Sequence, residues 1–160
     1  MAAAAELEQV LESTPSIPQF MTLFRQISDR IMPLYNSGQD QEVVRKSDHS
    51  PQTIADRISH EMMVDFFRIN SPHPVISEES YDEDESKFDS DCYWLVDPLD
   101  GTQGFINHSG EFAFMAALIK DGKPVMGLVY NPVSDVLYYA KKGKGAFRLD
   151  QTGIPQQLRV

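Results

Sequence analysis

The chain has 160 residues, of which 41% are hydrophobic and 24% charged, a composition typical of one globular domain with a real core. Its formal net charge is −10, which argues against binding to nucleic acid, because neutralising backbone phosphates needs Lys and Arg. No apolar run reaches the ~18 residues of a membrane span. The lone Cys92 excludes a disulfide framework, so we expect a cytoplasmic protein without membrane contact.

The start of the chain is predicted to be separate from the rest. Residues 2–12 are rich in Ala, Leu and Glu, which favours a helix. The Ser- and Pro-containing stretch 13–18 then interrupts the helical pattern. We therefore expect a helical extension at 1–18 and one α+β metal-binding domain at 19–160.

Two long amphipathic helices are predicted in the first half of the domain. Apolar residues recur every three or four positions over 19–35, and an Asn-Ser-Gly sequence ends that helix. A second helix is predicted over 51–70, with Ser50 as its N-cap and Pro51 at its first position. The apolar residues of both helices are expected to face the core.

The remaining chain is predicted to form short strands. They cover 43–46, 73–77, 93–96, 112–120, 124–130, 136–140 and 146–149. Gly- and Pro-containing turns separate the last four, with the spacing of an antiparallel meander. The strand at 93–96 is expected to stop at Pro98, which cannot donate a ladder hydrogen bond. The acidic stretch 81–91 is expected to be a solvated loop. Two helices layered on an antiparallel sheet predict the α+β class.

A string of site-forming residues, D-P-L-D-G-T at 97–102, follows the predicted strand at 93–96. Asp97 and Asp100 can converge if the intervening residues turn the chain, which is unfavourable unless a cation lies between them. Mg²⁺ prefers such carboxylate and carbonyl oxygens. Gly101 permits close approach of the backbone to a ligand, and the Thr102 hydroxyl can orient a water. The string predicts metal-assisted phosphoester chemistry; the alternative is a loop with two solvated Asp residues.

This string resembles the signature of the inositol monophosphatase superfamily, whose members are lithium-sensitive, magnesium-dependent phosphatases. The pattern K-x-D-x-S-P-x-T-x-A-D at 46–56 and several motifs within 104–133 are similar to the 3′(2′),5′-bisphosphate nucleotidase branch. The resemblance runs over about 46–147. It implies the first half of the sugar-phosphatase αβαβα fold.

The resemblance also implies roles for individual residues. The implied Mg²⁺ ligands are Glu78, Asp97, the Leu99 carbonyl and Asp100. Asp48 would assist Thr102 in orienting the attacking water, and Glu79 is expected to be a further acid beside the ligands. Backbone N–H groups of Gly101 and Thr102 would hold the phosphate.

The implied activity is Mg²⁺-dependent removal of the 3′-phosphate from 3′-phosphoadenosine 5′-phosphate, a by-product of sulfate metabolism. The partner would then be a small phosphorylated nucleotide. Two alternatives stay open. An inositol monophosphatase-like sugar phosphatase shares the metal motif, and a non-catalytic half-domain could bind one metal and a phosphate without turnover.

The chain departs from the family pattern in one respect. The family carries a further metal-binding Asp after a Trp, in a second α/β domain, whereas the only Trp here is Trp94 and Leu95 follows it. The last residues, 157–160, look like strand sequence from within a domain. We therefore expect the second domain to be absent and the isolated chain to be inactive, self-associating or dependent on a missing C-terminal half.

Overall fold

The computed structural model describes residues 2–37, 43–45, 51–83 and 90–159, and the structural statements below refer to these residues. The elements are α1 Ala2–Glu12, α2 Ile17–Asn36, β1 Val44–Arg45, β2 Pro51–Gln52, α3 Ile54–Asn70, β3 Val75–Ser77, the 3₁₀ segment η1 Glu78–Glu83, β4 Cys92–Asp100, α4 Thr102–Ile106, β5 Ala113–Lys120, β6 Lys123–Asn131, β7 Val136–Lys141, β8 Gly145–Leu149 and β9 Gln156–Leu158. Within the described ranges, no helix is long and apolar enough to cross a membrane.

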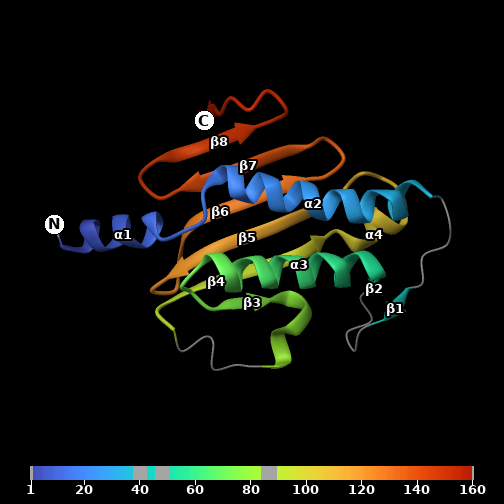
Figure 1. Ribbon diagram of the computed structural model, residues 1–160, viewed down its shortest axis with the longest axis horizontal. Coiled ribbons are helices and arrows are strands. Elements are labelled where there is room, and N and C mark those ends of the chain that lie inside the picture. The colour runs from blue at the N-terminus through green and yellow to red at the C-terminus, as the bar shows by residue number, and fades with distance from the viewer. Residues whose placement is uncertain (1, 38–42, 46–50, 84–89, 160) are drawn as a thin grey trace.

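Seven strands form the main sheet, in the spatial order β3-β4-β5-β6-β7-β8-β9 (Figure 1). Pairing is antiparallel from β4 through β9, as the turn spacing predicts. The first pair differs, because β3 runs parallel to β4 with Ser77 opposite Val96. The sheet is therefore mixed rather than purely antiparallel, and the predicted α+β class is confirmed. Strands β1 and β2 pair separately.

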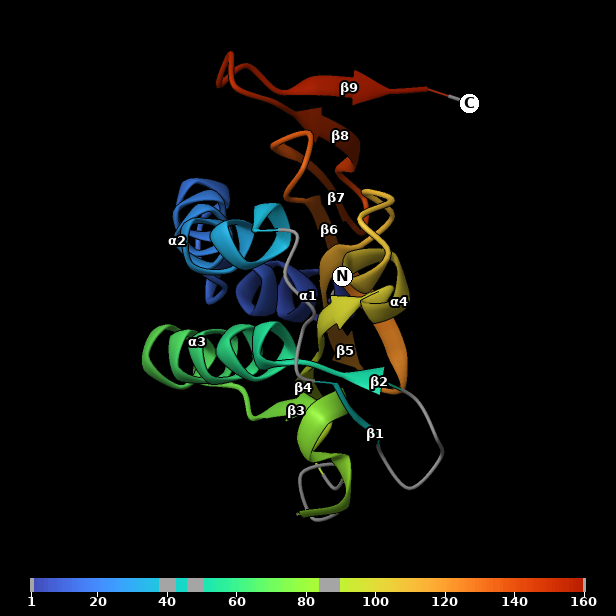
Figure 2. The same ribbon diagram turned by 90° about the vertical axis from the view of Figure 1, so that its right-hand side faces the viewer.

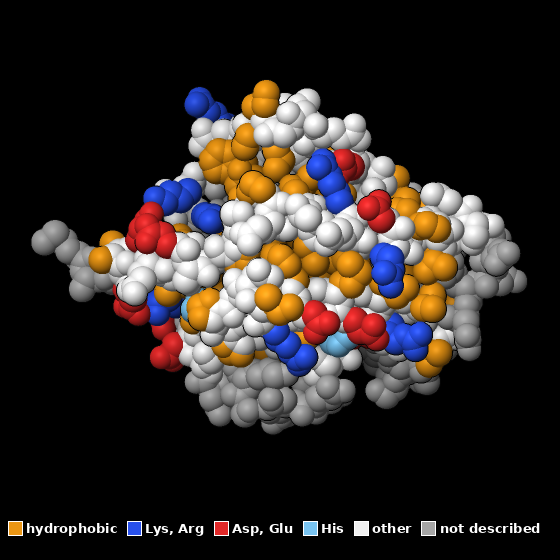
Figure 3. Space-filling view, in the orientation of Figure 1, with side chains coloured by type: hydrophobic (Ala, Val, Ile, Leu, Met, Phe, Trp, Pro, Cys, Tyr) orange, Lys and Arg blue, Asp and Glu red, His pale blue; other side chains and the backbone are white. Residues whose placement is uncertain are grey.

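Both long helices, α2 and α3, lie on one side of the sheet, and its opposite side is open among the described residues (Figures 1 and 2). Side chains alternate accordingly along β4. Trp94 and Val96 are buried beneath the helices, whereas Leu95 is 41% exposed. Viewed from the helix side, hydrophobic side chains fill the seam between α2 and α3 (Figure 3). The apolar pattern of both helices therefore builds the core on this one face.

An aromatic cluster joins α2, α3 and β4. The Trp94 ring centroid lies 4.6 Å from that of Phe67 and 5.7 Å from that of Phe20, and all three side chains are fully buried. The Trp94 Nε1–H donates to Ser71 Oγ at 2.9 Å, which satisfies the one polar group of the buried indole.

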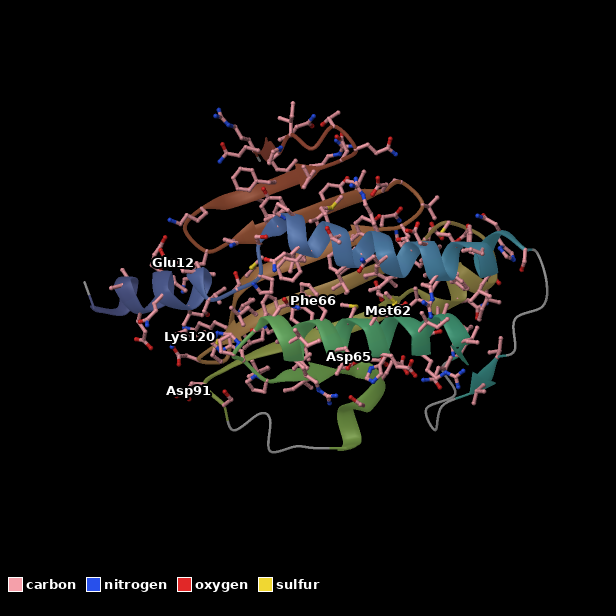
Figure 4. The ribbon with its side chains drawn as sticks, in the orientation of Figure 1. Glu12, Met62, Asp65, Phe66, Asp91 and Lys120 are labelled. Atoms are coloured by element: carbon pink, nitrogen blue, oxygen red, sulfur yellow. The ribbon has the colours of Figure 1, made fainter. Side chains whose placement is uncertain are left out.

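Helix α1 packs against the far end of the sheet. Leu11 is buried with the core, and Glu6 forms an ion pair of 2.7 Å with Lys120. Glu8 pairs with Lys144 at 2.9 Å. Figure 4 labels Glu12 of α1 and Lys120 of β5, both toward this end of the molecule. The expected helix is thus present, and the division of the chain at residue 18 stays a prediction.

The predicted start of α3 is wrong. Residues 51–52 form β2, and the N-cap is Thr53, whose hydroxyl accepts from Ala55 N–H while Asp56 accepts from Thr53 N–H in a capping box. Pro51 is typical of the first turn of a helix, but Pro also suits short edge strands such as β2. Met62 lies on the side of α3 that faces α2, and Asp65 lies on the opposite side (Figure 4).

The predicted end of β4 at Pro98 is also wrong. The strand continues to Asp100, but its register with β5 shifts, since Asp97 lies opposite Met115 and Asp100 lies opposite Ala113. Three steps on β4 match two on β5, so one extra residue is accommodated as a bulge. Pro98 lies in this irregular stretch, where no regular ladder bond is required of it. The predicted loop at 81–91 begins inside η1, and its residues 84–89 lie outside the described parts.

Candidate metal and phosphate site

Two of the predicted metal ligands lie next to each other where the parallel pairing of β3 and β4 ends. Ser77 is opposite Val96 in the last parallel pair, so Glu78 follows the end of β3 beside Asp97, which is still within β4. Both line a groove of about 1130 Å³ on the open face of the sheet, together with Glu79. The sheet topology thus brings together acids that are separated by the η1 segment and the loop in sequence.

Glu79 is tied to neighbouring elements. The Gln52 side-chain amide of β2 donates to Glu79 Oε2, and the Glu79 N–H donates to Ser77 Oγ at 3.4 Å. Ser77 Oγ is in turn hydrogen-bonded to His60 Nδ1 of α3 at 2.8 Å. The acid predicted beside the metal ligands is therefore fixed between β2 and the end of β3, and its catalytic role stays a prediction.

The bulge of β4 carries the other predicted ligands. The Leu99 N–H donates to Asp97 Oδ1 at 3.2 Å, and the Leu99 carbonyl accepts from Thr102 Oγ1 at 3.3 Å. Asp100 is exposed beside the bulge. Within the described residues, no three His, Cys, Asp or Glu side chains form a cluster able to hold a metal ion. The set of hard oxygens suits Mg²⁺ chemically, and the assignment of ligands stays a prediction.

Thr102 contacts a carboxylate that sequence reasoning missed. Its hydroxyl donates to Asp56 Oδ1 at 2.8 Å, across 46 residues of sequence. Asp56 is 1% exposed, and its other oxygen accepts from the N–H and the hydroxyl of Thr53 at 2.7 and 2.6 Å. The predicted partner, Asp48, lies outside the described residues. The local pattern T-x-x-D at 53–56 indicates a helix cap and carries no sign of the contact with Thr102.

The turn from β4 into α4 is unusually tight. Gly101 has φ of +85°, and a Cβ placed on it would lie 2.4 Å from the Glu111 carbonyl oxygen. A Cβ on Gly104 would lie 2.2 Å from the same oxygen. Only glycine fits this approach of two backbones. As at the start of any helix, the first N–H groups of α4, including that of Thr102, have no partner within the helix, and the phosphate contact stays a prediction.

The groove is acidic at one end and apolar along the rest. Among the described residues that line it, none is Lys, Arg or His. Glu78, Glu79 and Asp97 supply its charge, and Met115 and Val129 contribute to its apolar wall. A phosphate ester would be repelled by such a surface unless a cation lay between them. The acidic end of the groove therefore suits a cation, and a phosphate site beside it stays a prediction.

Comparison with known proteins identifies relatives over nearly the whole chain. The sequence profile of the inositol monophosphatase family matches residues 14–160. A curated relative, the 3′(2′),5′-bisphosphate nucleotidase CysQ of Salmonella typhimurium, is 43% identical over 145 residues, which cover 90% of this chain and 58% of the relative. The chain thus spans well under two thirds of the length of the curated relatives it matches.

Solved structures show the same relationship. The extragenic suppressor protein suhB of Bartonella henselae has a TM-score of 0.75 at 30% identity, over 90% of this chain and 54% of that one. CysQ of Bacteroides thetaiotaomicron, described as a bacterial member of the inositol monophosphatase family, has a TM-score of 0.67 at 33% identity, over 98% of this chain and 53% of that one. The chain belongs to the inositol monophosphatase family.

Proposed function

We propose that the chain forms the metal- and phosphate-binding part of a Mg²⁺-dependent phosphatase that removes the 3′-phosphate from 3′-phosphoadenosine 5′-phosphate. The observation that carries the proposal is the hydrogen bond of Thr102 to the buried carboxylate of Asp56. Thr102 follows the acids of the β4 bulge in sequence, separated from Asp100 only by Gly101. The names of the curated relatives support the nucleotide substrate. Cys92, which has no second cysteine to pair with, supports a cytoplasmic location.

The proposed metal ligands are Glu78, Asp97, the Leu99 carbonyl and Asp100. A divalent cation held there would offset the negative charge of the carboxylates and the phosphate and would act as a Lewis acid. Gly101 and Thr102 would hold phosphate oxygens through their backbone N–H groups.

Thr102 would position the attacking water. Because its hydroxyl proton is directed at Asp56 Oδ1, the nearer of its two acceptors, its oxygen lone pairs are left to accept a hydrogen bond from the water. Asp56, which is buried and holds three donors, keeps this hydroxyl in one orientation. The water oxygen would then attack phosphorus in line, and the bond from phosphorus to the 3′ oxygen would break. The leaving oxygen would take up a proton, giving the 3′ hydroxyl and inorganic phosphate.

The test is release of phosphate from 3′-phosphoadenosine 5′-phosphate by the chain in the presence of Mg²⁺, with and without lithium. Asp97→Asn removes a charge from the groove, and we expect it to abolish release. Asp91→Asn is the matched control, because Asp91 is an exposed acid before the same strand. Measurable release by the wild type that is unchanged in Asp97→Asn would refute the role of Asp97. Comparison with an inositol monophosphate as substrate tests the sugar-phosphatase alternative.

A non-catalytic half-domain that binds one metal and a phosphate is the second candidate. Calorimetric titration with Mg²⁺ separates the two candidates. Binding of Mg²⁺ that Asp97→Asn abolishes, without turnover by the wild type, supports the half-domain. Turnover by the wild type that Asp97→Asn abolishes refutes the half-domain.

We also propose that the open face of the sheet is covered in the active form by polypeptide that corresponds to the rest of the relatives' chains. Leu95, Val129 and Tyr138 are 41%, 40% and 43% exposed there, an apolar surface that favours a protein partner. Sedimentation of the chain, alone and mixed with the unmatched C-terminal part of Salmonella typhimurium CysQ, tests this. A complex with that part supports the proposal. A stable homodimer that does not bind the C-terminal part would favour self-association instead. A chain that stays monomeric and does not bind the C-terminal part would refute the proposal.

A further inference from the structure

One side chain, Asn131 at the end of β6, connects two segments of backbone near the candidate site. Its Nδ2 donates to the carbonyl oxygens of Gly110 at 3.2 Å and Phe112 at 3.1 Å. Its Oδ1 accepts from the N–H and the hydroxyl of Ser134 at 2.8 and 2.9 Å. Asn131 is half-buried, so these bonds are partly shielded from water. The amide therefore holds the β6–β7 turn with its oxygen and the segment before β5 with its nitrogen.

The other end of the same turn is anchored to α2. Arg25 donates to both oxygens of Asp135, at 2.9 and 3.0 Å, and the Tyr130 hydroxyl donates to Asp135 Oδ1 at 2.8 Å. Burial, together with this bond to Asp135, raises the pKa of Tyr130 to about 12, so the hydroxyl keeps its proton and remains a donor. The turn at 131–135 is thus fixed at both ends before Asn131 reaches toward Gly110.

The segment that Asn131 holds supports the turn into α4. The Glu111 carbonyl, between the two carbonyls bound by Asn131, packs against Gly101 and Gly104 so closely that neither position has room for a Cβ. The Ser109 N–H also donates to the Gly104 carbonyl at 3.0 Å. A shift of the Glu111 carbonyl would therefore remove the packing surface beneath the N–H groups at the start of α4.

We propose that Asn131 is a positioning residue for this turn. Its two donated hydrogen bonds set the Glu111 carbonyl, and the carbonyl in turn holds the Gly101–Gly104 backbone in the conformation that presents N–H groups to phosphate. The second half of this proposal rests on the proposed function, whereas the first half concerns the geometry alone. Asn131 acts through the intervening backbone and does not itself touch the substrate.

The experiment separates the two functions of the amide. Asn131→Asp keeps an oxygen that can accept from Ser134 and loses the donors to Gly110 and Phe112. Asn131→Ala loses both without adding charge, and it serves if the Asp variant does not fold. Hydrogen exchange is measured by NMR at hydrogen-bonded amides in and after α4, including those of Phe105 and Asn107, with the amides of β7 and β8 as an internal reference.

We expect exchange at the α4 amides to rise about tenfold in both variants, since both lose the two partly buried hydrogen bonds that Asn131 donates to Gly110 and Phe112. Exchange in β7 and β8 should change far less. Asn70→Ala is the matched control, since it removes an amide that also donates to a backbone carbonyl, that of Phe66, at the far end of α3. Unchanged exchange at α4, or an equal rise in all strands, would overturn the positioning role.

A second readout tests the connection with phosphate. Amide shifts of Gly101 and Thr102 are followed as Mg²⁺ and inorganic phosphate are added. Weaker binding by about tenfold in Asn131→Asp, with no change in Asn70→Ala, supports the full proposal. Equal affinity of Asn131→Asp and the wild type would overturn its second half. If the wild type binds no phosphate, that half fails together with the proposed function, while the exchange data decide the positioning role independently.

Discussion

Gly104→Ala gives a sharp test of the structure, because helix propensity and packing predict opposite signs. Replacing Gly by Ala inside a helix ordinarily stabilises a protein by up to about 1 kcal/mol. Here the new Cβ would meet the Glu111 carbonyl oxygen at 2.2 Å and the carbonyl carbon at 2.9 Å. The Glu111 backbone cannot rotate away as a flexible side chain can. The loss of stability from overpacking should therefore lie at the upper end of the usual range, about 3 kcal/mol. We expect a net loss of about 2 kcal/mol in the free energy of unfolding, after the ~1 kcal/mol gain in propensity is subtracted.

Urea unfolding followed by far-ultraviolet circular dichroism measures this change. Gly127→Ala is the matched control, because no atom lies within 4 Å of its Cβ position and its φ is negative or extended. That control should be neutral or stabilising by at most about 1 kcal/mol. A Gly104→Ala variant as stable as the wild type would show that the Glu111 carbonyl does not approach α4 as described.

Three further predictions follow from buried or paired charges. Asp56→Asn should lower the free energy of unfolding by about 2 kcal/mol, since it removes a helix cap and leaves buried donors without an acceptor. His73→Gln should reduce the loss of stability between pH 7 and pH 5. Burial, and after it the charge of Lys120, lowers the pKa of His73 in the folded protein. As the pH falls, the unfolded chain therefore takes up a proton near pH 6.5 before the folded one does, which favours unfolding. Arg25→Gln should cost about 1 kcal/mol, less in high salt, because the bidentate pair is partly exposed.

Each of these has a control of the same residue type. Asp65→Asn changes an exposed acid on the outer side of α3, His108→Gln an exposed loop histidine, and Arg30→Gln an exposed arginine of α2. Urea unfolding at several pH values and salt concentrations measures all six variants. Equal effects of a variant and its control would contradict the corresponding reasoning. For His73, an unchanged dependence of stability on pH would count against the burial argument.

The meander could be predicted from the sequence because its information is local. Asp121-Gly122 marks the β5–β6 turn, and residues near 131–135 mark the next one, so the ends of β5 to β8 fall within one or two residues of expectation. The two long helices were predictable for the same reason, because apolar residues at every third or fourth position over such a length indicate a helix and not a strand. The exception is the start of α3, where a strong local signal at Pro51 pointed to the wrong cap.

What could not be predicted depends on contacts between distant segments. No pattern within either strand's sequence indicates that β3 pairs parallel with β4, although this pairing brings Glu78 beside Asp97. The Thr102–Asp56 bond joins α4 to α3, and its carboxylate had a local role as a helix cap that concealed its second contact. The resemblance pointed to the right elements. It named Asp48, which lies outside the described residues and stays a prediction, and gave no role to Asp56, eight residues later in the same motif.

The position of Trp94 has a consequence for spectroscopy. It is the only tryptophan of the chain, it is fully buried against Phe67, and its indole N–H is bound to Ser71. A shielded indole emits at shorter wavelength than a hydrated one, so the intrinsic fluorescence of this protein reports on the junction of α2, α3 and β4. The ring faces the helices, whereas Asp97, three residues later, faces the groove. The emission wavelength should therefore change when the helices separate from the sheet and should change little when a ligand binds in the groove.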